Sequence, residues 1–136
     1  MRVLVDTSVW IEFFGPKDSV SQRALEFLIQ EGSVVTCLPV RAEVFSGKIN
    51  PKLRDRLQKS FDAMDRVDPD WNLVATWDVI ANFAARARKS GISVPGLVDR
   101  MILASALQGE ARLWTLDLGL QRLAKVLGLS LFFPEK

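Results

Sequence analysis

The chain has 136 residues, 49% of them hydrophobic, so it is long enough to bury a core of its own, and we expect one domain spanning residues 1–136. A single cysteine and no histidine exclude zinc-finger, disulfide and haem-attachment frameworks, and also catalytic triads and ribonuclease mechanisms that depend on histidine. The net charge of +2 is too small to indicate nucleic-acid binding by itself, and no apolar run is long enough to cross a membrane, so we expect a cytoplasmic protein.

The first apolar run ends at an acidic residue. Residues 2–5 read as a short strand, Asp6 interrupts the run, and helical spacing begins in the segment 9–11. In an open parallel sheet, ligand sites gather where the carboxyl ends of the strands open into a crevice. Asp6 is therefore a candidate site residue, although its position fits equally well a residue that caps the following helix.

Capping and turn residues divide the rest of the chain into helices and strands. Ser19 and Gln22 form a capping-box pattern that opens a helix ending near Gly32, and Asn50-Pro51 opens another. Helical spacing predicts three more helices, over residues 71–90, 99–108 and 120–127. Short apolar runs predict strands at residues 2–5, 34–37, near 67, 112–115 and 130–133. Strands that alternate with helices predict an α/β fold with a parallel sheet covered on both faces.

Three further carboxylates occupy similar junctions. Glu43 lies just after the predicted strand 34–37, in what reads as a half-buried helix, where a solvated glutamate is the simpler interpretation. Asp99 stands in the first turn of a helix that is apolar nearly all round and therefore buried, although an acid there also interacts favourably with the helix dipole. Asp117 follows the predicted strand 112–115 and fits a cap as well as a site residue.

These acids share one feature, since all lie at or near a junction between a strand and a helix, or at a helix start. Convergence on one site is the better single explanation. Two unit charges about 4 Å apart repel by about 4 kcal/mol at an effective dielectric constant of about 20, so such a cluster needs a bound cation or shared protons. An all-oxygen set of ligands selects a hard cation, magnesium or manganese, over zinc.

The same segments resemble the acidic motifs of PIN-domain nucleases. The resemblance covers essentially the whole chain and rests on residues 3–11 (VLVDTSVWI), 41–44 (RAEV), 98–106 (VDRMILASA) and 115–117 (TLD). The chain length and the DTSVWI opening are most similar to the VapC-type (virulence-associated protein C) toxins of toxin-antitoxin pairs. The resemblance implies a three-layer α/β/α fold around a central, mainly parallel sheet. It also implies a magnesium- or manganese-dependent endoribonuclease that forms a homodimer and is inhibited by a cognate antitoxin.

The resemblance further implies roles for the four acids. Asp6 and Asp99 would bind the metal directly, whereas Glu43 and Asp117 would bind it directly or through metal-bound water. The last motif departs from the family pattern, which often has a further acidic or polar residue two positions after the aspartate, where this chain has Gly119. The sequence therefore supports a first metal better than a second.

Hydroxyl and basic side chains beside the acids are candidates for supporting roles. Thr7, Ser8 and Thr115 can orient the carboxylates or contact a phosphate, although Thr7 and Ser8 also suit helix caps. Arg100, next to Asp99, is a candidate phosphate contact, although a solvated helix arginine is the simpler interpretation.

Aromatic residues suggest where an RNA or a protein partner would bind. Sequence-specific RNA cleavage usually targets unpaired loops, where bases can stack on side chains. We expect Trp77 and Trp114 in the core, which leaves Trp71, in a polar loop, open to a base. The segment 10–14 places four large apolar residues in five positions, more than one buried helix face holds, so we expect some of them in a groove filled by another chain.

Two other functions stay open at this point. A phosphatase of the haloacid-dehalogenase type also has an aspartate after its first strand and uses it as a nucleophile. That plan needs a second aspartate two residues further on, where this chain has Ser8. A non-catalytic binding module with the same PIN-like fold would keep the acids for structure alone.

Overall fold

Four short strands form one parallel sheet in the computed structural model, which describes residues 1–15 and 19–135. The strands lie in the order β3-β2-β1-β4 and are β1 (Val3–Val5), β2 (Val34–Thr36), β3 (Asp65–Arg66) and β4 (Arg112–Trp114). Leu4 pairs with Val35 on one side and with Leu113 on the other, so β1 is central and buried on both faces.

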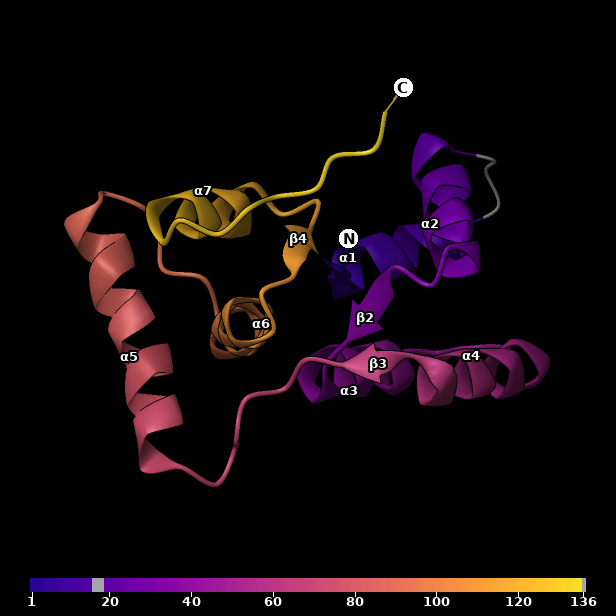
Figure 1. Cartoon of the computed structure of the whole chain (residues 1–136), viewed down its shortest axis with the longest axis horizontal. Helices are drawn as coiled ribbons and strands as arrows, with labels where there is room; N and C mark the ends of the chain where they lie inside the picture. The colour runs from indigo at the N-terminus through magenta and orange to yellow at the C-terminus, as the bar shows by residue number, and fades with distance from the viewer. Residues whose placement is uncertain (16–18, 136) are drawn as a thin grey trace.

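Helices cover both faces of this sheet. The described residues contain α1 (Thr7–Phe13), α2 (Val20–Gln30), α3 (Leu38–Ser46), α4 (Pro51–Ala63), α5 (Val74–Lys89), α6 (Leu97–Gln108) and α7 (Leu118–Val126). Figure 1 shows α5, α6 and α7 on one side of the strands and α1 to α4 on the other. The chain steps from β1 through β2 to β3 and then back past β1 to β4, and right-handed crossovers in opposite directions place their helices on opposite faces. The three-layer α/β/α fold expected from the sequence is confirmed.

Two helix starts follow the predicted capping chemistry. The Ser19 side chain accepts a hydrogen bond from the Gln22 backbone N–H, and the Gln22 side chain accepts one from the Ser19 N–H, which is the reciprocal capping box. Asn50 caps α4 by accepting from the Lys52 N–H, with Pro51 at the first helical position. These predictions are confirmed.

The structure corrects the start of one predicted helix and the extent of one predicted strand, and it confirms the end of another helix. The fifth helix begins at Val74, later than predicted, because Asp70 folds residues 70–73 into a turn by accepting from the Asn72 N–H. The predicted strand 130–133 is reduced to a single parallel bridge between Leu131 and Leu113. Gly109 ends α6 with an ordinary φ of −87°, and it is required because a Cβ at this position would overlap the side chain of Val67.

The core gathers on both faces of β1 and holds two of the tryptophans. Trp10 and Trp114 are both 1% exposed, as expected for Trp114. The prediction that Trp77 is a core residue is wrong, since its side chain is 39% exposed and donates from Nε1 to the carbonyl of Trp71. Cys37 is fully buried, and burial raises the pKa of its thiol to about 12, which makes it a structural residue. No helix in the described ranges is both long and apolar enough to span a membrane.

Candidate functional site

The carboxyl ends of β1 and β4 meet at one edge of the sheet and place two site candidates beside each other. Val5 pairs with Trp114, so the residues that follow them, Asp6 and Thr115, leave the sheet together. The Asp6 N–H donates to the Trp114 carbonyl over 2.9 Å, which continues the ladder by one residue. The parallel pairing thereby joins positions more than a hundred residues apart in the chain.

The Asp6 carboxylate is buried and held by two hydroxyl groups. Its side chain is 3% exposed, and its Oδ2 accepts hydrogen bonds from Thr115 Oγ1 at 2.7 Å and from Ser8 Oγ at 2.8 Å. Asp6 stands at the N-cap position of α1 but makes no capping hydrogen bond, so the cap interpretation is wrong for its side chain. Both hydroxyls donate to Oδ2, which leaves Oδ1 without a hydrogen-bond donor among the described residues.

Glu43 reaches the same region from α3. The Thr7 hydroxyl donates to Glu43 Oε1 over 2.7 Å, so the residue next to Asp6 orients the glutamate of another helix. Thr7 is buried and Glu43 is half-buried, which makes a freely solvated glutamate a wrong interpretation. Thr7 and Ser8 both donate to carboxylates rather than cap α1.

Asp117 combines a structural role with its place near the site. Its Oδ1 accepts from the Leu120 N–H at 2.9 Å, which confirms the predicted cap of α7. Its own N–H donates to Thr115 Oγ1, the hydroxyl that also binds Asp6. A Cβ at Gly119 would lie 3.2 Å from Asp117 Oδ1, so a side chain there would crowd the capping carboxylate.

Asp99 shows that the four carboxylates lie within electrostatic range of one another. Burial raises the pKa of its carboxyl group to about 6, and the negative charges of Asp6, Asp117 and Glu43, in that order, add to the shift. Asp99 stands in the first turn of α6 and makes no capping hydrogen bond. The elements that carry the other three acids therefore bring them around the start of α6.

The carboxylates of this cluster are too far apart to bind one metal ion in their present positions. Within the described ranges, no three acidic or cysteine side chains lie close enough together to hold a metal ion without adjustment. The donor set nevertheless fits a hard divalent cation, because every member is a carboxylate, one oxygen of Asp6 has no donor among the described residues, and repulsion adds to the burial that raises the pKa of Asp99. A bound cation would remove that repulsion.

Arg100 and Trp71 both make hydrogen bonds within the protein. Arg100 donates from Nε to the Pro95 carbonyl and from Nη1 to the Ile80 carbonyl, so it joins the start of α6 to α5, and its phosphate contact stays a prediction. Trp71 is half-buried and donates from Nε1 to Asp68 Oδ1.

Sequence reasoning missed two residues that support the site region. Gln121 donates from Nε2 to the Thr115 carbonyl over 2.8 Å. No local sequence pattern predicts that a polar helix residue makes such a contact. Asp68 lies two residues after the end of β3, and its Oδ1 accepts from the Leu38 N–H at the start of α3. The position of an acidic residue shortly after a short predicted strand is the sequence feature that could have identified Asp68 as a candidate.

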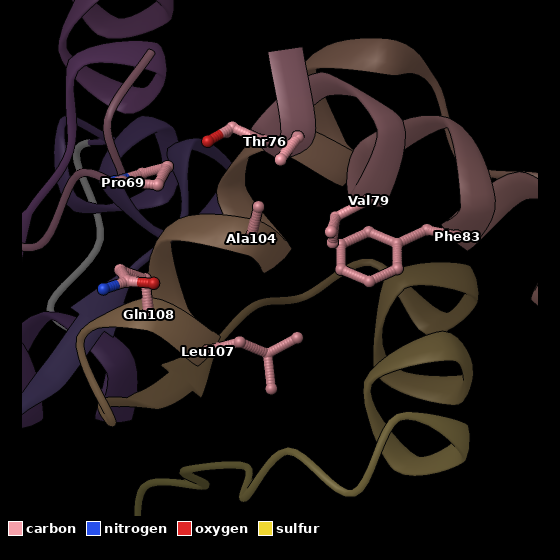
Figure 2. A pocket seen from close by; sticks show the side chains of 8 residues that line it. Pro69, Thr76, Val79, Phe83, Ala104, Leu107 and Gln108 are labelled. Carbon is pink, nitrogen blue, oxygen red and sulfur yellow. The ribbon is translucent and has the colours of Figure 1, made fainter. Parts of the chain in front are cut away.

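A hollow in the surface elsewhere is chemically unlike the carboxylate cluster. It lies between α5 and α6 and has a volume of about 340 Å³. Figure 2 shows Val79, Phe83 and Leu107 among its lining side chains. No acidic or basic side chain lines it, so it offers no group for acid–base or metal chemistry.

Neutralising one acid of the cluster should stabilise the metal-free protein. Because the folded state raises the pKa of Asp99 from 3.8 to about 6, the ionised carboxylate costs stability above pH 6, and this cost disappears as the pH falls towards 4. Solvent screening reduces the stability cost of this half-buried carboxylate to about 1 kcal/mol. Asp99→Asn should therefore raise the melting midpoint in EDTA at neutral pH by roughly 2 to 4 °C.

Thermal melts at pH 7 and pH 4, with and without magnesium, measure this. The gain should shrink at pH 4, and added magnesium should stabilise the wild type more than the variant. A variant that melts below the wild type in EDTA would show that Asp99 is a structural hydrogen-bond partner instead of a member of a repelling cluster.

Comparisons with known proteins agree with this geometry. The model of the family described as PIN domain matches residues 3–126. The chain is 24% identical over 130 residues to ribonuclease VapC11 of Mycobacterium tuberculosis, an alignment that covers 94% of this chain and 96% of that protein. The same identity and coverage hold for VapC ribonuclease Mb1587 of Mycobacterium bovis.

Solved structures share the fold. FitAcB from Neisseria gonorrhoeae superposes with a TM-score of 0.71 at 23% identity, over 97% of both chains. VapBC2 from Rickettsia felis, solved bound to a DNA fragment from the promoter of its own genes, superposes with a TM-score of 0.68 at 18% identity, over 97% of this chain and 98% of that one. At these identities the structural similarity shows a shared fold alone.

Proposed function

The chain belongs to the PIN-domain family, and from that premise we propose that it is a divalent-metal-dependent endoribonuclease, the VapC-type toxin of a toxin-antitoxin pair. The observation that carries the proposal is that hydroxyl groups orient the carboxylates of Asp6 and Glu43 at one edge of the sheet. Burial raises the pKa of Asp99 beside them, and the charges of Asp6, Asp117 and Glu43 add to that shift. A cluster of carboxylates without histidine is suited to a hard cation and to little else.

Asp6 and Asp99 would hold magnesium or manganese directly, and Glu43 and Asp117 would hold it directly or through water. When bound, such a cation polarises phosphoryl oxygens and lowers the pKa of a water molecule.

The hydroxyl groups of Thr7, Ser8 and Thr115 orient the carboxylates of the cluster. Thr115 and Ser8 fix one oxygen of Asp6 by hydrogen bonds and leave the other without a donor among the described residues, and Thr7 fixes one oxygen of Glu43. Carboxylates held in this manner lose little freedom when they bind a ligand, which is the advantage of a preorganised site.

The partners follow from the same family membership. The relatives carry the name VapC ribonuclease, and the superposable structures include VapBC2 bound to promoter DNA. We infer that RNA is the substrate, that a small antitoxin protein inhibits the chain, and that the chain forms a homodimer.

Comparing two kinds of phosphate ester tests this function against its alternatives. In manganese buffer the protein should cut a structured RNA internally and leave a phosphomonoester such as p-nitrophenyl phosphate intact. Hydrolysis of the phosphomonoester alone would support the haloacid-dehalogenase-like phosphatase, and no turnover of either substrate would support the non-catalytic module.

A further inference from the structure

A basic groove lies on the flank of the helix that carries Glu43. Its lining residues come from α3 and α4, which lie along the same edge of the molecule (Figure 1), and they are Leu38, Arg41, Ala42, Phe45, Arg54 and Gln58. The hollow has a volume of about 400 Å³. Among the residues that the structure describes, two guanidinium groups and no carboxylate line it, so its chemistry favours an anion.

Phe45 organises the two arginines of this groove. The Arg41 guanidinium carbon lies 5.4 Å from the centroid of the Phe45 ring, and that of Arg54 lies 5.3 Å from it. Arg54 also donates from Nη1 to the Phe45 carbonyl over 3.1 Å, which ties α4 to the end of α3. Both guanidinium groups thus contact one aromatic side chain.

The two arginines differ in their charge balance. Arg41 Nη1 pairs with Asp62 at 2.8 Å, so its charge is partly neutralised. No acidic side chain pairs with Arg54 within the described part of the chain, and its hydrogen bond there goes to the Phe45 carbonyl. Arg54 is exposed and carries the uncompensated positive charge of the groove.

We propose that this groove is a phosphate-binding subsite for the RNA strand, with Arg54 as its principal contact. The inference rests on the proposed nuclease function and extends it from the cutting site to the bound strand. Ala42 lines the groove and the next residue, Glu43, belongs to the carboxylate cluster, so the groove and the cluster flank the same helix, α3. The guanidinium fork suits phosphate oxygens, and the Phe45 ring keeps the fork in place.

Binding of a labelled single-stranded RNA of mixed sequence, measured by fluorescence anisotropy in EDTA at several salt concentrations, tests the subsite without cleavage. Arg54→Gln should weaken binding about fivefold and reduce the slope of log affinity against log salt by about 0.7, the loss of one phosphate contact to a single strand. Arg54→Lys keeps the charge, so it should keep the salt slope and lose only part of the affinity.

Arg56→Gln is the matched control, because it makes the same change on the same helix two positions away, on the opposite face. It should alter affinity by less than about twofold. Equal effects of Arg54→Gln and Arg56→Gln would overturn the subsite. So would an Arg54→Gln variant that loses binding of a poly-glutamate peptide but keeps RNA affinity, since the groove would then serve an acidic protein partner.

Cleavage measured in manganese separates this proposal from the nuclease proposal. Arg54→Gln should raise KM for RNA and leave kcat nearly unchanged, because Arg54 is not part of the carboxylate cluster. If the wild type cuts RNA and Arg54→Gln has an unchanged KM, the subsite fails and the nuclease stands. If Arg54 is needed for RNA binding and the wild type cuts nothing, the nuclease fails and the RNA-binding groove stands.

Discussion

Asp6→Asn should lower the rate of RNA cleavage by a factor of about 100 or more at saturating manganese. Loss of a residue that merely orients a metal ligand costs about 10- to 100-fold, and Asp6 is proposed as a ligand itself. The amide keeps the shape of the side chain, but it removes the charge that a cation requires. The measurement is the initial rate of cleavage of a labelled RNA by the purified variant.

Asp78→Asn provides the matched control for this experiment. Asp78 is an exposed acid on α5, so the same change there alters net charge equally and should leave cleavage unchanged. Thermal melts of both variants check that the fold is intact. An Asp6→Asn variant that cuts RNA at the wild-type rate in the same buffer would show that the metal-ligand assignment is wrong.

Co-expression with a cognate antitoxin, which we expect to be a small protein encoded by a neighbouring gene, should convert a growth-arresting protein into a harmless complex. The family membership supplies the expectation of an antitoxin, and the exposure of apolar side chains suggests which residue to test for contact with it. Of the apolar segment 10–14, Trp10 is buried and Phe13 and Phe14 pack partly against the core, whereas Ile11 is 63% exposed. Among the apolar residues of that segment, Ile11 is therefore the one most available to contact another chain.

Growth after induction and co-purification measure this prediction. Ile11→Ser should weaken the complex, and the control Val74→Ser should not, although Val74 is 75% exposed on α5. A chain that is harmless alone and retains no small partner would argue against the toxin assignment and leave the nuclease untouched.

Local chemistry explains which parts of the fold could be predicted from the sequence. The Ser19 capping box and the Asn50-Pro51 start depend on residues within three positions of each other, so their patterns are visible in the chain. The junction at Asp6 was visible for the same reason. The strand predicted at 130–133 was not reliable, because apolar residues near the end of a chain also serve simply to pack, as Leu131 does beside Leu113.

Contacts between segments that are distant in the chain could not be predicted from the sequence. The hydrogen bonds from Thr7 to Glu43 and from Thr115 to Asp6 join residues 36 and 109 positions apart, and each depends on how helices and strands dock. The exposure of Trp77 had a similar cause, since its helical spacing matched a buried face while its indole bonds to the Trp71 carbonyl at the surface. Spacing identifies a helix face, but tertiary packing decides how much of that face is covered.

The requirement for a cation is the central claim, and titration of metal into stripped protein tests it most directly. Wild-type protein is treated with EDTA, dialysed, and assayed on labelled RNA while magnesium or manganese is added back. The carboxylate cluster predicts that cleavage is absent in the stripped protein and returns in proportion to bound metal, with no recovery in Asp6→Asn. Undiminished cleavage by the wild type in EDTA would contradict the claim, because no cation would then be needed to activate water in a chain without histidine.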